Sequence, residues 1–442
     1  MIKLPKQVNK AIYLLKNSGF EAYAVGGAVR DCLLGKVPFD WDITTSARPK
    51  ETEKVFCGER IIETGIKHGT VTVIIDGMPL EITTYRIDGD YTDHRHPKTV
   101  SFSDNLRDDL SRRDFTINTL CCNCDDKIID AFGGKDDLNN KIIRCVGDPD
   151  TRFSEDALRI IRAVRFSAEL GFKIEKSTSD SILKNRRLLS DVSKERLQVE
   201  FTKLITGKYA TDVIRKYHAV IEVFIPELAP LVECEQHTKY HKYDVFEHTL
   251  HAVDAIDFND RILRLTMFFH DFGKPDAKTT DENGTSHFKG HAVISEKKTR
   301  DILKRLKFDN NTINEVSKLV LIHDMKSPRD KIQAKKMMCS LGDEAYLNLI
   351  KIKRADNIAK ADPHAIDEKL KNMRSFYEEI KASNECYNLK SLAVNGDDIK
   401  AFGIAEGKEI KSSLDFLLNG VIEGKCQNRK DELLEYLKEN TK

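Results

Sequence analysis

The hydrophobic positions at the start of the chain follow two different periods. Val8, Ile12 and Leu15 recur at the spacing of one helix face. Residues 71–75 and 80–85 are rich in β-branched and aromatic side chains, which favours strands. The Asp-Gly pair between these two runs predicts a hairpin turn. The first third of the chain is therefore predicted to be an α/β domain.

Beyond Gly147-Asp148-Pro149 the pattern turns helical and stays helical to the end of the chain. Residues 152–166 are predicted to form one helix, because Ala157, Ile160 and Val164 share a face. No run approaches the roughly 20 apolar residues of a membrane span. The first residues also lack the apolar run of a signal peptide. We therefore expect a cytoplasmic protein without a membrane partner, in which the ten cysteines are reduced thiols.

The overall charge does not announce a nucleic-acid partner. The 442 residues carry 72 basic and 71 acidic side chains, a net charge of +1. An RNA-binding surface would therefore need its positive charge gathered locally. The length corresponds to about three domains of ordinary size.

A glycine pair marks a candidate phosphate loop. Gly26 and Gly27 follow a predicted strand, residues 22–25, and open a predicted helix. Glycines allow backbone N–H groups to approach phosphate oxygens, and a helix N-terminus favours anions. Arg30 could add a charged contact. The alternative is a simple connecting turn.

Asp40 and Asp42 follow this loop and form a candidate magnesium site. Residues i and i+2 of a strand point to the same face, and Mg²⁺ is often bound by one or two carboxylates plus substrate phosphates. Glu81, on a predicted neighbouring strand, is a candidate third acid. The alternatives are a solvated polar turn for the pair and an ordinary surface position for Glu81.

Two further segments offer nucleotide contacts. Arg112 and Arg113 precede the apolar stretch that ends at Asn118, and adjacent arginines suit a triphosphate. The alternative is an ordinary helix start with Asp114 near the cap.

The second segment is the predicted helix of residues 152–166. Its polar face carries Asp156, Arg159, Arg162 and Arg165, and Glu155 can pair with Arg159 at i,i+4. An Asp acceptor beside an Arg donor could accept the edges of cytosine and adenine and reject uracil and guanine. A solvated, salt-bridged face is the alternative reading.

Histidines and aspartates in the second half of the chain form a candidate metal site for phosphoester hydrolysis. Any one of these histidines taken alone is more often structural than a ligand. The adjacent His-Asp pair at the end of an apolar helix carries most of the signal. The proposed ligands are His248, His270, Asp271 and Asp356, with His291 and His323 as further candidates.

Taken together, these segments resemble the class II tRNA nucleotidyltransferase/poly(A) polymerase family, and most closely the bacterial CCA-adding enzymes that carry an HD domain. The resemblance covers nearly the whole chain. It rests on residues 26–31, the acids Asp40 and Asp42, residues 112–118 and 130–138, the group Glu155, Asp156 and Arg159, and the later Glu195, Arg196 and Glu200.

The resemblance implies a polymerase-β-like α/β nucleotidyltransferase head followed by all-α neck, body, HD and tail domains. The expected boundaries are 1–146 for the head, 147–205 for the neck with the base template, 206–235 for the body, 236–375 for the HD phosphohydrolase-like domain and 376–442 for the tRNA-binding tail.

The implied activity is addition of C, C and A to a tRNA 3′ end from CTP and ATP, with release of pyrophosphate and two bound Mg²⁺ ions. A further divalent metal is expected in the HD domain. Residues 90–102, with Arg95 and Pro97, resemble the flexible loop of members that add the terminal A. An A-adding enzyme, a poly(A) polymerase, a metal phosphohydrolase with a vestigial head and a non-catalytic tRNA-binding protein remain alternatives. Trp41 departs from the small or β-branched residue that is more usual between the two acids.

Overall fold

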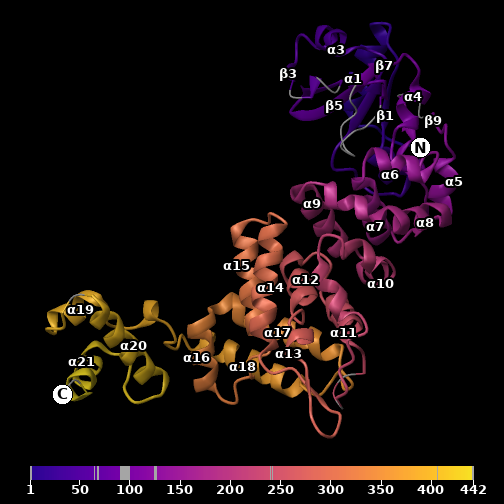
Figure 1. The fold of residues 1–442 in the computed structure, drawn as a ribbon. Helices are drawn as coiled ribbons and strands as arrows, with labels where there is room; N and C mark the ends of the chain where they lie inside the picture. Colours follow the sequence, from indigo (N-terminus) through magenta and orange to yellow (C-terminus); the bar gives the residue numbers. More distant parts are fainter. Residues whose placement is uncertain are drawn as a thin grey trace. The chain divides into compact units, whose positions relative to one another are not determined.

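The computed structural model describes residues 2–63, 65–66, 69–89, 100–123, 127–238, 240, 242–405 and 407–440. The chain divides into two compact units, Met1–Ala229 with Arg305–Lys307, and Pro230–Lys304 with Phe308–Lys442 (Figure 1). The finer division into five domains stays a prediction. Among the described helices, none combines the length and the apolar character that crossing a bilayer requires.

The first unit begins with a mixed sheet. Seven strands pair in the order β3-β4-β5-β2-β1-β8-β9. The strands of this region are β1 (Ala22–Val25), β2 (Asp42–Thr45), β3 (Arg60–Ile62), β4 (Thr70–Ile75), β5 (Met78–Thr84), β6 (Arg86–Asp88), β7 (Val100–Phe102), β8 (Cys121–Cys122) and β9 (Ile128–Ile129). The helices among them are α1 (Lys6–Asn17), α2 (Gly27–Leu33), α3 (Pro49–Val55), α4 (Leu106–Ser111), the short 3₁₀ helix η2 (Thr116–Asn118) and α5 (Gly134–Asn139).

The predicted hairpin is confirmed. β4 and β5 pair in antiparallel register, and Asp76 and Gly77 between them have φ values of 47° and 81°. Positive φ at both central residues is the geometry of a type I′ turn, which matches the twist of the flanking strands. β5 also pairs in parallel with β2, and this pairing sets Glu81 opposite Asp42.

The remainder of the first unit is helical. α7 packs against α9 and α10. The elements are β10 (Ile142–Ile143), α6 (Pro149–Glu155), α7 (Leu158–Leu170), β11 (Lys173–Ile174), α8 (Lys176–Asn185), η3 (Arg186–Asp191), α9 (Lys194–Ile205), α10 (Ala210–Ile221) and η4 (Pro226–Leu231).

The prediction of one continuous helix over residues 152–166 is wrong. α6 ends at Glu155, Asp156 is extended (φ −133°, ψ 101°), and α7 begins at Leu158. The Asp156 carboxylate accepts a hydrogen bond from the backbone N–H of Leu158 at 3.1 Å. A short Asp side chain competes with the helix for such N–H groups, which accounts for the break.

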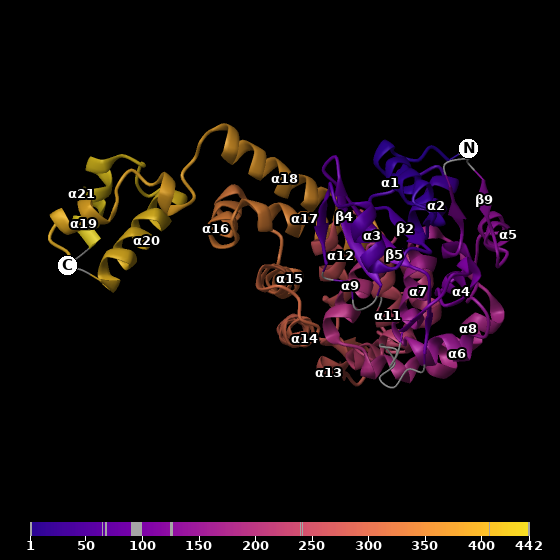
Figure 2. The ribbon, with the colours of Figure 1, turned by 90° about the horizontal axis from the view of Figure 1, so that it is seen from above.

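The second unit is almost entirely helical, and its central helices α11, α12, α15 and α17 pack together. Its elements are α11 (Val245–Asp254), α12 (Arg261–Phe269), α13 (Lys274–Ala277), β12 (Thr279–Thr280), β13 (Ser286–His287), α14 (His291–Arg305), α15 (Asn310–Ile322), α16 (Lys331–Leu341), α17 (Asp343–Ile358), α18 (Asp367–Ala382), η5 (Leu389–Ser391), α19 (Gly396–Ala401), α20 (Lys408–Ile422) and α21 (Lys430–Asn440). The last three helices gather around a small apolar core of their own that includes Ile399, Leu417 and Leu433 (Figure 2).

Candidate active site and candidate metal centre

The glycine loop lies directly against the candidate magnesium acids. Gly26 has φ +82° and caps α2. A Cβ atom at Gly26 would lie 3.2 Å from Arg113 Nη1 and 3.8 Å from Asp42 Oδ2. Glycine therefore supplies both the left-handed backbone and the space in which the loop, an arginine and a carboxylate meet.

The two acids differ from the sequence prediction in one respect. Asp42 is the first residue of β2, whereas Asp40 precedes the strand and is exposed. Trp41 between them is only 6% exposed. The two acids therefore flank a buried indole, and the charge of Asp40 is close enough to raise the pKa of Asp42. Glu81 is in register with Asp42 on the adjacent strand, so its side chain belongs to the same face.

Asp40, Asp42 and Glu81 together carry more negative charge than the neighbouring Arg113 can neutralise. Burial raises the pKa of Asp42 to about 6 against the opposing effect of Arg113, and the charges of Glu81 and Asp40 add to the rise. A divalent cation between these carboxylates would remove their repulsion, so the donor set fits Mg²⁺.

Asp109 is a functional neighbour that sequence reasoning missed. Its carboxylate is fully buried, lies 2.6 Å from Arg112 Nη2 and 3.6 Å from Arg113 Nη2, and accepts a hydrogen bond from Thr44 Oγ1 at 2.9 Å. Within the described chain, the buried Nε of Arg113 makes no hydrogen bond. Asp109 thus orients both arginines, and its i,i+3 and i,i+4 spacing to them was the available signal.

Asp114 joins the head to the helix α7. It accepts hydrogen bonds from Arg162 at 2.7 Å and from the Asn118 amide at 3.0 Å. Although burial acts in the opposite direction, Arg162 and Asn118 hold the pKa of Asp114 below its ordinary range. Arg30 Nη1 in turn donates to Asn118 Oδ1 at 2.8 Å. Asp114 is therefore the centre of a buried polar chain rather than a simple helix cap.

The proposed base-template residues have separate partners. Asp156 pairs with Arg196 at 3.0 Å, whereas Arg159 pairs with Glu155 at 2.8 Å, as predicted. The second nitrogen of Arg159 donates to the carbonyl oxygen of Arg112 at 2.6 Å. These fixed partners orient an acceptor within the break between α6 and α7 and a donor in the first turn of α7.

Arg165 is occupied by structural contacts. Its side chain lies 2.9 Å from Glu200 and 3.4 Å from Glu169, with the guanidinium 3.8 Å from the centre of the Phe166 ring. Both Arg162 and Arg165 already have carboxylate partners. Their predicted contacts with a nucleotide therefore remain predictions. The predicted loop of residues 90–102 lies largely outside the described residues.

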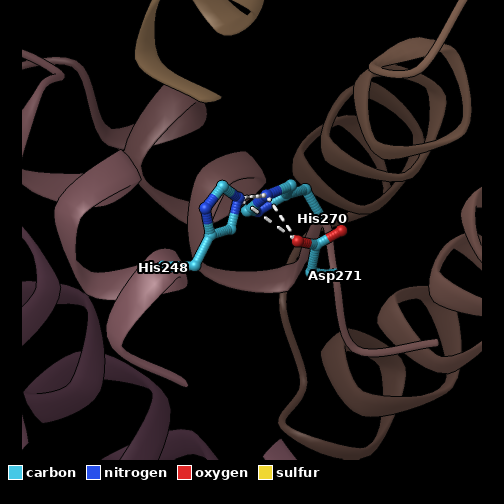
Figure 3. A group of neighbouring side chains, drawn as sticks. All are labelled: His248, His270 and Asp271. Atoms are coloured by element: carbon cyan, nitrogen blue, oxygen red, sulfur yellow. Dashed lines mark hydrogen bonds and ion pairs between the residues drawn. The ribbon is translucent and has the colours of Figure 1, made fainter. Parts of the chain in front are cut away.

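In the second unit, all six candidate metal ligands lie together. Three of them, His248, His270 and Asp271, are shown in Figure 3. Asp271 belongs to two buried groups of ligand atoms, one with His248 and His270 and one with His291 and His323. Its Oδ2 lies 3.1 Å from His270 Nε2, and its Oδ1 lies 3.4 Å from His291 Nε2. Asp356 adds a carboxylate 3.0 Å from His248 Nε2.

The imidazoles are oriented by the main chain. Nδ1 of His270, His291 and His323 lies 2.6–2.8 Å from the carbonyl oxygen three residues earlier. A carbonyl only accepts, so each Nδ1 carries the proton and each Nε2 presents a lone pair to the cluster. Burial lowers the pKa of His323 to about 3, which keeps that ring neutral. Oδ1 of buried Asp271 accepts no hydrogen bond from the described residues, and Nε2 of His291 and of His323 lies within 4 Å of it, so the arrangement fits divalent metal ions.

Two lysines beside this cluster were not predicted. Lys274 Nζ lies 2.6 Å from Asp271, and Lys360 Nζ lies 2.5 Å from Asp356. Their spacing of three and four residues from the acids, within or next to helices, was the signal that could have found them.

Comparison with known proteins identifies the family. The model for a poly A polymerase head domain matches residues 22–144, and the model for tRNA nucleotidyltransferase domain 2 matches residues 279–437. A CCA-adding enzyme of Geobacillus sp. (strain WCH70) is 34% identical over 428 residues, covering 96% of this chain and 95% of that protein. The chain belongs to the family of CCA-adding enzymes.

Solved structures agree with this assignment to the CCA-adding enzymes. The crystal structure of the Bacillus stearothermophilus CCA-adding enzyme in complex with CTP is 29% identical, with a TM-score of 0.68, and covers 98% of this chain and 96% of that chain. A Thermotoga maritima CCA-adding enzyme complexed with tRNA, 21% identical with a TM-score of 0.64, covers 100% of this chain and 97% of that chain and supports the fold. The predicted family and fold class are confirmed.

We predict that Asp42→Asn stabilises this CCA-adding enzyme when metal is absent. The folded-state pKa of Asp42 is raised above its ordinary value of 3.8. The negative charge of Asp42 therefore destabilises the folded protein. This destabilisation is complete above about pH 6 and absent below pH 3.8. The Tm of the metal-free protein at pH 7.5 should rise by about 2–4 °C, the shift that corresponds to roughly 1 kcal/mol in a unit of this size.

Added Mg²⁺ should raise the Tm of the wild type but not that of Asp42→Asn. Asp136→Asn, an exposed acid on α5, is the matched control and should leave both the Tm and the response to Mg²⁺ unchanged. An equal response to Mg²⁺ in Asp42→Asn would remove Asp42 from the metal site.

Proposed function

We propose that this chain adds C, C and A in turn to the 3′ end of tRNA, using CTP and ATP and releasing pyrophosphate. The observation that carries the proposal is the convergence of Gly26, Arg113 and Asp42 within about 4 Å, in a chain that aligns over nearly its whole length with CCA-adding enzymes. We expect the reaction to take place in the cytoplasm.

In the proposed mechanism the chain binds the triphosphate between the glycine loop and the arginines. The backbone N–H of Gly27 and the side chain of Arg113 contact the phosphates, while Asp109 holds the arginines in place. The N–H of Gly26 donates instead to the carbonyl oxygen of Leu120 at 3.2 Å. Two Mg²⁺ ions held by Asp40 and Asp42, with Glu81 nearby, would lower the pKa of the attacking 3′-hydroxyl and neutralise the leaving pyrophosphate. The 3′-hydroxyl loses its proton, its oxygen forms a new bond to the α-phosphorus, and the bond from that phosphorus to the oxygen bridging to the β-phosphorus breaks, which releases pyrophosphate.

Base selection falls to Asp156 and Arg159. The carboxylate of Asp156 is fixed by Arg196 and by the Leu158 N–H, so its acceptor positions do not rotate. Arg159 is fixed by Glu155 and the Arg112 carbonyl. Acceptor and donor held in this way match the exocyclic amine and ring nitrogen of cytosine and adenine, whereas uracil and guanine would leave buried polar groups unpaired.

The test of the proposed function is incubation of the protein with Mg²⁺ and a tRNA that ends at its discriminator base. With CTP and ATP together, the product should stop after C-C-A, and CTP alone should add two residues. Asp40→Ala should lower the rate by at least about 10³-fold, since one metal ligand is lost. ATP incorporation without CTP, or an untemplated run of A, would instead support an A-adding enzyme or a poly(A) polymerase.

We predict that Asp156→Asn weakens discrimination against UTP. Asn has the shape of Asp but can also donate, so it can pair with the uracil carbonyl. The ratio of kcat/KM for CTP over UTP should fall by about ten- to a hundredfold. Asp180→Asn, an exposed acid on α8, should leave the ratio unchanged. An unaltered ratio in Asp156→Asn would exclude Asp156 as a template residue.

A second function is favoured by the buried cluster of four imidazoles and two carboxylates. We propose that it hydrolyses phosphoesters with bound divalent metal. His248, His270, Asp271 and Asp356 would hold one ion, and His291 and His323 with the second oxygen of Asp271 would hold another. Such ions polarise a phosphoryl oxygen and generate hydroxide from water at neutral pH.

His270→Ala should abolish metal-dependent hydrolysis of 4-nitrophenyl phosphate and lower the amount of bound Mn²⁺, while CCA addition by the other unit persists. His287→Ala, which removes an exposed histidine of the same unit that pairs with Asp281, should leave all three measurements unchanged. Equal loss of hydrolysis and CCA addition in His270→Ala would indicate a structural role for the cluster instead.

A further inference from the structure

A cavity opens beside one side of the metal cluster. Its volume is about 400 Å³, and His323 and Asp356 of the cluster line it. This volume falls within the range of small-molecule sites, about 300–1,000 Å³. Segments from two parts of the unit form its walls, the turn after α15 and the helices α17 and α18. A ligand in this cavity would therefore reach the candidate metal ligands directly.

The walls of the cavity are strongly basic. Five cationic side chains line it, and the only acids are Asp324 and the cluster ligand Asp356. Lys360 is neutralised by Asp356 at 2.5 Å. No ion pair within 4.0 Å joins the other four cations to any carboxylate that the structure describes. These four are Lys326, Arg329, Lys353 and Lys369.

Lys353 is the most informative of the four. It projects from α17 and is half-buried, unlike Lys326, Arg329 and Lys369, which are exposed at the rim. Burial lowers the pKa of the Lys353 ammonium from its ordinary value. A desolvated cation without an ion-pair partner is costly unless an anion completes the site. Its position on the wall shared with Asp356 therefore points to a bound anion next to the metal cluster.

We infer that this cavity binds the dianionic phosphate of a nucleotide-sized phosphomonoester, presented either as a free nucleotide or as the phosphorylated end of an RNA. The inference rests on the hydrolytic function proposed for the cluster. A monoester carries close to two negative charges above pH 6, whereas a diester carries one, so a cavity whose four cations without an ion pair outnumber its one further acid, Asp324, favours the monoester. In the reaction, a water oxygen forms a new bond to phosphorus, the ester P–O bond breaks, and the alcohol leaves with a proton from that water.

Binding of inorganic phosphate to the full-length, metal-free protein tests the cavity without relying on activity. Titration calorimetry at pH 8 should show phosphate binding about tenfold weaker in Lys353→Met than in wild type, the effect of losing one charge-assisted contact. Lys351→Met is the matched control, because Lys351 lies on the same helix but is exposed and outside the cavity. Lys326→Met and Lys369→Met should each weaken binding less, and because both side chains are exposed we expect little change in the stability of the fold. Equal affinities in Lys353→Met and Lys351→Met would overturn the inference.

Hydrolysis by the Mn²⁺-loaded protein gives the second readout. The wild type should prefer 4-nitrophenyl phosphate to bis(4-nitrophenyl) phosphate by at least about tenfold, and Lys353→Met should narrow this preference. Comparison of cytidine 3′-phosphate with a short RNA that ends in a 3′-phosphate distinguishes the two sources of the monoester. A preference for the diester would overturn the inference but leave the hydrolase in place. The protein could also bind phosphate through Lys353 but neither bind Mn²⁺ nor hydrolyse either ester. That result would support anion binding in the cavity and refute the hydrolytic function.

Discussion

The ion pair between Asp114 and Arg162 is the contact on which the organisation of the first unit depends. It joins the segment after α4 to helix α7 at 2.7 Å and is largely withdrawn from solvent. A buried carboxylate without its partner is strongly destabilising, so the two elements cannot separate without a large energetic cost. Asn118 bonds to the same carboxylate, and Arg30 bonds to Asn118. The helix that follows the glycine loop, the arginine segment and the helix of the candidate base template are thereby held in one geometry by a chain of polar contacts.

The buried acids that hold the fold together differ from those of the candidate metal sites in the charges that surround them. Asp109 and Asp114 are surrounded by arginines, and their pKa values are lowered although both are buried. Asp42 has two carboxylates near it and a raised pKa. Asp271 has a cationic partner, Lys274, at its Oδ2, while its Oδ1 faces the imidazoles of His291 and His323, which are oriented to present lone pairs. An acid paired on all sides fixes the fold, whereas a carboxylate oxygen whose neighbours are negative or lone-pair donors leaves room for a cation.

The sequence predicts features whose signal is local or repeats with a short period. The type I′ hairpin, the glycine loop and the i,i+4 pair of Glu155 with Arg159 are all of this kind. The six candidate metal ligands could also be named, because the adjacent His-Asp pair at the end of an apolar helix is chemically distinctive. The break at Asp156 could not be predicted from helical periodicity, since it depends on a side chain bonding to a backbone N–H. The pairing of Asp156 with Arg196 and the location of Lys353 on a cavity wall depend on contacts between distant segments, which carry no local pattern.

The strand order of the sheet has a consequence for how the protein is made. β1 lies near the middle of the sheet and pairs on one side with β2 and on the other with β8, where Ala24 is opposite Cys122. During synthesis the chain leaves the ribosome from its N-terminus, so β1 must wait for β8 before its second edge is covered. Pairing between strands so far apart in sequence is intrinsically slow. Asp42 therefore lies for some time on an incomplete sheet with an open edge. The geometry of the candidate active site can form only after residues 112–118 have also left the ribosome.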